Sequence, residues 1–254
     1  MCQMMGVILR SSSAKYSKQL SEQKKIMYSL IDQFPITGEI DIQFHYSLSN
    51  WQPFYWRGFK QTTNYTYVLE NIEEQSVWKE LRSNIRTDIK KATKSLSIRD
   101  DLGIERFIEI YEKSFKRQKM KMPYGQKLIS RLDRVCSDQN KRRISFALDN
   151  QNRIHAAIYT VWDNKSAYYI MGGADPDLRN SGAHSLLIWD SILYTSSFVQ
   201  RFDFEGSMNE NIEAFFRAFG GHQMPIINVY RRDQLEDSAI KEPLRKRICS
   251  KFSV

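Results

Sequence analysis

Two acidic residues in the segment RFDFEGS, residues 201–207, are the first candidates for chemistry in this sequence. Alternation along a buried strand would place Phe202 and Phe204 on one face and Asp203 and Glu205 on the other. Two neighbouring carboxylates beneath helices are costly unless they are paired, protonated or used in a reaction. A carboxylate with a raised pKa is a suitable proton acceptor, so the pair is a candidate for general base catalysis.

A structural interpretation of the same acids stays open beside the catalytic one. One acid would cap the helix that starts between Ser207 and Asn209, and the other would pair with Arg201 or Arg217. For Asp203 we weigh this interpretation at least equally with a catalytic role.

The elements around the two acids follow from hydrophobic periodicity. Two amphipathic helices are expected between Ile98 and Val135, because apolar residues recur there at three- and four-residue spacing. Three strands (ISFAL, RIHAAIYTVW and AYYIMGG) follow, separated by the hairpin-turn compositions DNQN and DNKS. A helix is expected over 181–198, followed by the acidic strand and by a helix from Asn209 that stops at Gly220 and Gly221. The strand PIINVYRR comes last. The whole order indicates an α/β layout with a mostly antiparallel sheet.

The N-terminal third has a different pattern. A helix is expected over 15–34, and the aromatic, alternating stretch 40–69 indicates antiparallel strands. The spacing predicts one helix over 76–94, with Ser76 as its cap. The outer face of this helix carries a basic stripe, which is either a solvated face, a lid over an anionic ligand or a surface for a phosphate backbone; the stripe comprises Lys79, Arg82, Arg86, Lys90 and Lys94.

Composition narrows the class of protein. The 254 residues carry a formal net charge of +9, which would concentrate anionic ligands such as nucleotides, phosphorylated carriers or nucleic acid. No apolar run approaches the roughly eighteen residues of a membrane span, and no secretory leader is recognisable, so we expect a cytoplasmic protein. Cys2, Cys136 and Cys249 are far apart, and no histidines have metal-ligand spacing, so neither disulfides nor a metal are expected.

Five motifs in series carry a family resemblance. The segments WRGFKQTTNYTYVL, IRTDIKKATK, GGADPDLRNSGAHSLLIWDSI, FDFEGS and FFRAFGG resemble the GNAT acyltransferase superfamily, in the branch related to the Fem peptidoglycan peptidyltransferases. The resemblance covers about 51–232. It implies a partial GNAT-like half over 1–96, a complete GNAT-like acyltransferase domain over 97–232 and a basic tail over 233–254.

The resemblance also implies a donor site. In the GNAT fold a coenzyme A pyrophosphate binds backbone amides at a helix start, where unpaired N–H groups and the helix dipole favour an anion. The residues that match this helix start are Arg179, Asn180, Ser181, Gly182 and Ala183. His184 departs from the pattern, because glycine or alanine is expected there. Gly172 and Gly173 would let the amide arm of the ligand pair with the backbone at a bulge, or they form a plain turn.

Catalytic roles are carried over in the same way. Glu205 would accept the proton of an amine, and Asp203 would orient the Glu205 carboxylate or hold the acceptor cation. Many relatives protonate the leaving group with a tyrosine where this chain has Phe216. Either a different leaving group applies here, or Tyr168 or Tyr169 of the central strand substitutes for that tyrosine. Aromatic residues in such a strand are more often part of the core.

The resulting prediction is an N-acyltransferase for an amine on a small molecule, glycan or peptide, plausibly a cell-envelope or saccharide precursor. Acyl-coenzyme A is the donor named first, and aminoacyl-tRNA is the alternative. His184 and Phe216 both argue mildly against coenzyme A. A catalytically degenerate binding protein and a nucleic-acid-binding protein stay open as other classes. Acceptor contacts are expected from Trp56, Arg57, Gln61 and Arg217, and no metal is expected.

Overall fold

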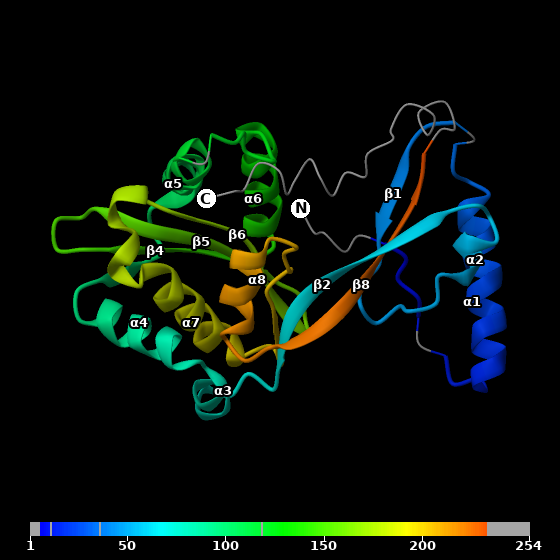
Figure 1. The fold of residues 1–254 in the computed structure, drawn as a ribbon, viewed down its shortest axis with the longest axis horizontal. Coiled ribbons are helices and arrows are strands. Elements are labelled where there is room, and N and C mark those ends of the chain that lie inside the picture. The colour runs from blue at the N-terminus through cyan, green and yellow to red at the C-terminus, as the bar shows by residue number, and fades with distance from the viewer. Residues whose placement is uncertain (1–5, 11, 36, 118, 233–254) are drawn as a thin grey trace. The chain divides into compact units, whose positions relative to one another are not determined.

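The computed structural model describes residues 6–10, 12–35, 37–117 and 119–232, so the predicted tail 233–254 lies outside the described residues. The chain forms two compact units (Figure 1). The large unit spans residues 65–224, and the small unit consists of the described residues up to 64 together with those from 225 onward. Strands β2 and β8 each run from one unit into the other.

The described strands belong to one eight-stranded sheet with the order β1-β8-β2-β7-β6-β5-β4-β3. Their bounds are Ile40–Gln43 (β1), Lys60–Glu70 (β2), Ser97–Arg99 (β3), Arg142–Leu148 (β4), Ile154–Trp162 (β5), Ser166–Ala174 (β6), Arg201–Asp203 (β7) and His222–Arg231 (β8). The β3–β4, β4–β5, β5–β6, β2–β7 and β1–β8 pairs are antiparallel, whereas β6 and β7 are parallel. The α/β fold class with a mostly antiparallel sheet is confirmed.

Helices cover both faces of the sheet in the large unit (Figure 1). Helices α5 (Gly103–Arg117) and α6 (Gln126–Asp138) lie on one face, and α7 (Ala183–Ser196) lies on the other with α4 (Ser83–Thr93) packed outside it. Strand alternation divides the core, because neighbouring residues of a strand point to opposite faces. In β5, Ile158 packs in the cluster of α7, and Tyr159 packs in the cluster of α5.

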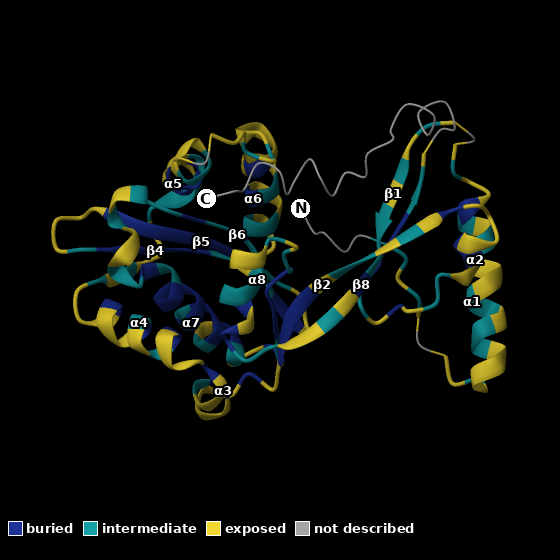
Figure 2. Cartoon of the chain, in the orientation of Figure 1, coloured by how far each residue is buried: buried dark blue, intermediate teal, exposed yellow. Residues whose placement is uncertain are grey.

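The three strands β4, β5 and β6 form the predicted meander. Ile144 lies opposite Tyr159, and Ile158 lies opposite Gly172. The β5–β6 register shifts next to Tyr159, so that one extra residue of β6 forms a β-bulge. Most of β4, β5 and α7 is buried, whereas β6 is partly buried, as Figure 2 shows. The burial of β4, β5 and α7 matches their nearly continuous apolar sequences.

The single helix predicted over 76–94 is wrong: the chain forms α3 (Glu74–Glu80) and α4 with a break between them. Leu81 and Arg82 have extended backbones at the break. The buried Leu81 side chain joins the core, and the Arg82 N–H donates to the carbonyl oxygen of Ala218 at 2.9 Å. Ser76 therefore lies inside α3 and does not cap it. A tertiary hydrogen bond replaces a helical one here, which periodicity along the chain does not reveal.

The small unit has a core of its own. Helix α1 (Tyr16–Ile31) and a short helix α2 (Gln52–Tyr55) contribute Met27 and Phe54, which pack with Phe44 and Val229. Helix α2 corrects the expectation of strands throughout 40–69. Pro53 lies in the first turn of α2, where a missing N–H has no cost and the fixed φ suits a helix.

The compact units divide the chain elsewhere than at the predicted boundary after residue 96. The large unit begins at residue 65, so β2, α3 and α4 fold with the acyltransferase-like part of the chain. The reason lies in the apolar face of α4: Ile85 and Ile89 pack in the same cluster as Leu187 and Ile188 of α7. Separating α4 from α7 would expose both faces to water.

Candidate functional site

The acidic strand β7 lies between β2 and β6, and the sheet forks where it ends. Val68 of β2 and Tyr168 of β6 both lie opposite Asp203, the last residue of β7. Beyond this point β6 continues to Ala174, whereas the chain after Asp203 leaves the strand. The fork of β6 and β7 is thus centred on Tyr168 and Asp203, and this is where the predicted acids lie.

Asp203 is fully buried at the fork. Its Oδ1 accepts hydrogen bonds from the Thr66 hydroxyl at 2.5 Å and from the Glu205 N–H at 2.8 Å. Its Oδ2 is buried without a hydrogen-bond partner among the described residues. Burial raises the pKa of Asp203 to about 6, although the bonds from Thr66 and Glu205 act in the opposite direction. A carboxyl group with a pKa of about 6 can both bind and release a proton at pH values near neutrality.

Glu205 does not continue the alternation of the strand. Its φ of +58° lies in the left-handed region, which is strained for a residue with a side chain. The Asp203 carboxylate holds this conformation by accepting the Glu205 N–H, as in an Asx turn. Gly206 also has a positive φ, and a side chain there would overlap the Tyr65 carbonyl of β2. Glu205 is buried beside Asp203, in a loop whose backbone is fixed from two sides.

The structural partners proposed for the two acids bind other residues. Arg201 pairs with Glu70 at 3.4 Å, and Arg217 pairs with Glu213 at 2.9 Å. Asn209 caps α8 (Glu210–Arg217) with its own side chain, which accepts from two amides of the first turn. Asp203 therefore neither caps α8 nor pairs with either arginine.

Tyr169, predicted as a proton donor, has a partner at the fork that the sequence did not indicate. Its hydroxyl lies 2.9 Å from Nε2 of His184, in the first turn of α7. Burial lowers the pKa of His184 to about 4 and raises the pKa of Tyr169, so both groups are neutral near pH 7. Two neutral groups that each carry an exchangeable proton can pass one along their hydrogen bond.

Rings from α8 enclose this pair. Tyr169 packs against Phe216 with ring centroids 5.6 Å apart, and His184 packs against Phe215 at 5.7 Å. Phe204, directly after Asp203, packs against Phe216 at 5.2 Å. The Tyr169 ring thus contacts Phe216, the position where the family resemblance expects a tyrosine. A proton donor from β6 in place of one from α8 fits this arrangement.

The two glycines predicted to receive a donor arm are packed by the protein itself. A side chain at Gly172 would overlap the Tyr169 hydroxyl, and one at Gly173 would lie 2.8 Å from Cα of Tyr111 in α5. Ser114 of α5 also exchanges hydrogen bonds with the backbone of Ala174. The β-bulge in β6 lies at Ile170, before the two glycines, and the glycines make room for Tyr169 and α5.

The predicted pyrophosphate site at the start of α7 is covered by α4. Gly182 has a φ of +76°, and a methyl group there would lie 2.5 Å from the carbonyl oxygen of Asp88. The Asp88 carboxylate lies 3.4 Å from the hydroxyl of Ser185, so it places a negative charge at the helix N-terminus where an anionic ligand would bind. Lys91 donates to the carbonyl oxygen of Asn180. The Asp88 carboxylate of α4 therefore occupies the position at this helix start that a bound phosphate would take.

The remaining predicted donor residues also have internal roles. The Arg179 side chain donates to the carbonyl oxygen of Pro176, and the Ser181 hydroxyl accepts the N–H of Ala183. Together with the covering Asp88, these contacts do not fit a coenzyme A pyrophosphate at this helix start.

Replacing Gly182 by alanine tests the close approach of α4 and α7. We expect a loss of about 2–4 kcal/mol in the free energy of unfolding, because left-handed strain and overpacking against the Asp88 carbonyl add together. Gly103→Ala is the control: it has a φ of +80°, but a methyl group there meets only the movable Glu105 carboxylate. Equal losses in urea denaturation of the two variants would contradict the tight contact.

The predicted acceptor residues do not share one unit. Trp56, Arg57 and Gln61 lie in the small unit, and Arg217 lies in the large one. The Lys24 ammonium lies 4.7 Å from the centroid of the half-exposed Trp56 ring. Arg57 pairs with Asp32, and Gln61 donates to Thr63. Their role toward an acceptor stays a prediction.

Two further properties concern the described part of the chain. No group of three or more His, Cys, Asp or Glu side chains within it could hold a metal ion. None of its helices combines the length and the apolar character that crossing a membrane requires.

Comparison with known proteins places the chain in a family. The sequence profile described as "Acetyltransferase (GNAT) domain" matches residues 79–211, just over half of the 254 residues. The chain belongs to the GNAT acetyltransferase family. The match includes α4, the fork and the start of α8, so the GNAT domain is the part of the chain that carries the site. No protein among the curated ones matches the sequence.

Solved structures show the same fold at low sequence identity. A structure of FemX aligns with a TM-score of 0.64 at 10% identity, covering 83% of this chain and 75% of FemX. A tandem GNAT protein from the clavulanic acid biosynthesis pathway aligns with a TM-score of 0.54 at 9% identity, covering 88% and 72%. The C-terminal domain of a putative lysylphosphatidylglycerol synthetase from Agrobacterium fabrum aligns with a TM-score of 0.53 at 9% identity, covering 74% and 67%. These likenesses support the Fem-related GNAT fold.

Proposed function

We propose that this GNAT protein transfers an acyl group from an activated ester to an amine, with Tyr169 and His184 supplying the proton to the leaving group. The observation that carries the proposal is the 2.9 Å contact between the Tyr169 hydroxyl and the His184 Nε2 at the fork of β6 and β7. Tyr169 is a half-buried residue, its hydroxyl keeps its proton at neutral pH, and a neutral imidazole lies behind the hydroxyl.

The proposed reaction begins with an amine that arrives as an ammonium ion. Glu205 accepts one proton of the ammonium group, and the free amine attacks the acyl carbonyl carbon. The attacking nitrogen is positively charged once the new carbon–nitrogen bond has formed, and it loses a second proton to solvent, so that the product is a neutral amide. Backbone N–H groups of β6 beyond the fork stabilise the oxyanion. When the carbon–oxygen bond of the ester breaks, Tyr169 gives its proton to the departing oxygen. His184 returns a proton to Tyr169 from Nε2 and takes one from solvent at Nδ1, so no charge stays on the imidazole.

The donor that we propose is an aminoacyl ester of tRNA. An alkoxide is a poorer leaving group than a thiolate and depends more on a proton donor, so the Tyr169–His184 pair suits an ester. The covered start of α7 disfavours acyl-coenzyme A, the donor that the family resemblance names first. The net charge of +9 suits an RNA partner. Structural similarity to FemX and to a putative lysylphosphatidylglycerol synthetase adds to this support.

The acceptor in this proposal is an amine on a saccharide or peptide precursor of the cell envelope, and the reaction takes place in the cytoplasm. Within the large unit we assign an acceptor contact to Arg217 on α8; Trp56, Arg57 and Gln61 of the small unit, taken by itself, stay predicted acceptor contacts. Trp56 offers an exposed ring that can stack on a sugar, and the guanidinium groups can bind phosphate or carboxylate.

Thermal unfolding with three ligands tests the choice of donor. The protein is heated alone, with acetyl-coenzyme A, with free coenzyme A and with a mixture of aminoacylated tRNAs. We expect only the tRNA to raise the melting temperature, because a ligand bound to the native state alone stabilises it by mass action. Radiolabelled aminoacyl groups are then followed onto a panel of amines, including amino sugars and peptides.

The possible results test the identity of the donor and the occurrence of acyl transfer separately. A clear rise in melting temperature with acetyl-coenzyme A would contradict the ester donor and leave acyl transfer in place. The absence of any rise, together with no labelled product, would favour a catalytically degenerate binding protein.

A further inference from the structure

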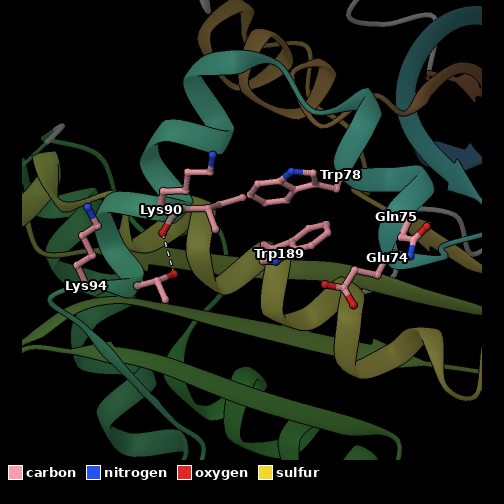
Figure 3. A pocket seen from close by; sticks show the side chains of 8 residues that line it. Glu74, Gln75, Trp78, Lys90, Lys94 and Trp189 are labelled. Carbon is pink, nitrogen blue, oxygen red and sulfur yellow. Dashed lines mark hydrogen bonds between the residues drawn. The ribbon is translucent and has the colours of Figure 1, made fainter.

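A pocket in the large unit lies away from the fork, between α3, α4 and α7 (Figure 3). Its volume is about 610 Å³, within the range of small-molecule sites. Its walls are formed by Trp78, Trp189, Ile89 and Thr93, and its rim by Lys90, Lys94, Glu74 and Gln75. The break between α3 and α4 brings Trp78 against Trp189, so this pocket depends on the feature that the sequence pattern missed.

The apolar wall presents aromatic surface to the pocket. The rings of Trp78 and Trp189 have centroids 5.1 Å apart and are inclined by 59°. Trp78 is half-buried and Trp189 is 8% exposed, so both are held by the protein and keep only part of their surface at the pocket. Indole rings fixed in this way favour a flat ring as ligand, because stacking requires no further ordering of the side chains.

One side of the rim is positively charged. Lys90 and Lys94 lie four residues apart around the end of α4, and Figure 3 shows both on the same side of the indoles. Both are exposed, and no described residue pairs with either ammonium group. Arg86, one turn earlier, differs because its guanidinium donates to the carbonyl oxygens at the end of α3. Two unpaired ammonium groups next to an aromatic wall suit a ligand with a phosphate beside a flat ring.

The opposite side of the rim supplies acceptors. Glu74 and Gln75 begin α3 and lie across the indoles from the lysines in Figure 3. A carboxylate and an amide oxygen can accept hydrogen bonds from the hydroxyl groups of a sugar.

We propose that this pocket binds a nucleoside phosphate, with the base against Trp78 and Trp189, the phosphate at Lys90 and Lys94, and the ribose toward Glu74 and Gln75. The ligand is either a free nucleotide or a nucleotide of a single-stranded RNA, since both present the same chemistry. This site is independent of the proposed acyl transfer, because it uses none of the residues at the fork.

Titration of the full-length protein with AMP tests the proposal through quenching of tryptophan fluorescence and calorimetry. We expect AMP to bind, and adenosine and ribose 5-phosphate each to bind at least about tenfold more weakly, because each lacks one of the two groups that the pocket contacts. A ten-residue oligoadenylate is titrated in parallel. Tighter binding of AMP identifies a free nucleotide as the ligand, and tighter binding of the oligomer identifies RNA. The absence of binding by both would overturn the proposal.

Charge-matched variants locate the site. Lys90→Gln/Lys94→Gln is expected to weaken AMP binding by about tenfold or more. Lys127→Gln/Arg131→Gln removes two exposed charges at the same spacing on α6 and is expected to leave binding unchanged. Equal weakening by the two double variants would show a general charge effect and would contradict the pocket. In Trp78→Phe, AMP should quench less of the tryptophan fluorescence, because the ring that the base contacts is gone. Quenching equal to that of the wild type would show that the base does not lie on Trp78.

Discussion

Replacing Tyr169 by phenylalanine is expected to lower the rate of acyl transfer by about a hundredfold to ten-thousandfold, the range in which a positioned proton donor contributes. The ring and its packing against Phe216 remain in this variant, so only the hydroxyl and its contact with His184 are lost. The rate is measured in single turnovers with the donor and amine that the wild-type protein accepts. His184→Ala should show a smaller loss, because solvent can return the proton to Tyr169.

Tyr168→Phe is the matched control, because this neighbouring hydroxyl bonds Asp163 instead of a residue of the fork. Nuclear magnetic resonance of the His184 ring gives an independent check: the imidazole should stay neutral until the pH falls to about 4. Wild-type rates in Tyr169→Phe would remove the proton donor from the mechanism. A His184 ring that gains its second proton near its ordinary pKa would show that the Tyr169–His184 pair is not buried as described.

The second large effect concerns the pH dependence of stability. Asp203 has a pKa raised from 3.8 to about 6, which corresponds to about 3 kcal/mol. Between these pH values the unfolded chain has lost the proton that the folded protein still binds. The folded state therefore loses stability relative to the unfolded chain as the pH rises from about 4 to about 6. Above that range the loss is complete.

Asp203→Asn removes this titration and keeps an oxygen that can accept from Thr66 and Glu205. The free energy of unfolding of the wild type, taken relative to Asp203→Asn, should fall by about 2 kcal/mol between pH 4 and pH 7. Urea denaturation at several pH values gives this difference. Asp138→Asn, at an exposed position of α6, should run parallel to the wild type. Parallel curves for the wild type and Asp203→Asn would mean that the buried carboxyl has an ordinary pKa.

The predictability of the fold differed between elements. The meander β4–β5–β6 and helices α5 to α8 follow from apolar periodicity and turn composition, because each of these segments buries one regular face or lies wholly within the core. The break between α3 and α4 was not predictable, since the hydrogen bond from Arg82 to Ala218 joins residues far apart in the chain. Helix α2 was missed because its aromatic residues have high strand propensity, whereas a local turn with Pro53 decides its conformation.

At the site, residue types alone identified the positions but not the partners. Asp203, Glu205 and Tyr169 all lie at or beside the fork, but Glu205 lies after the end of β7 and does not share the strand face that alternation predicted. His184 was noted only as a bulky departure, and its contact with Tyr169 depends on how α7 approaches β6. The sequence pattern gave no indication of Thr66 or Asp88, because the residues that they contact, Asp203 and Ser185, are distant along the chain. Gly182 looked like a phosphate-binding glycine, although α4 uses the space that a side chain would fill.

Residue types and their spacing are enough to predict the α/β class, the order of the elements in the acyltransferase domain and the strand end that carries two acids. They are enough because burial of apolar faces and turn chemistry are local properties that periodicity records. The tertiary structure decided which groups meet: the Asp203 contact with β2, the Tyr169–His184 pair, the cover of α4 over α7 and the Trp78 pocket. These depend on the packing of elements that are distant in sequence, where one backbone hydrogen bond or one glycine changes the outcome.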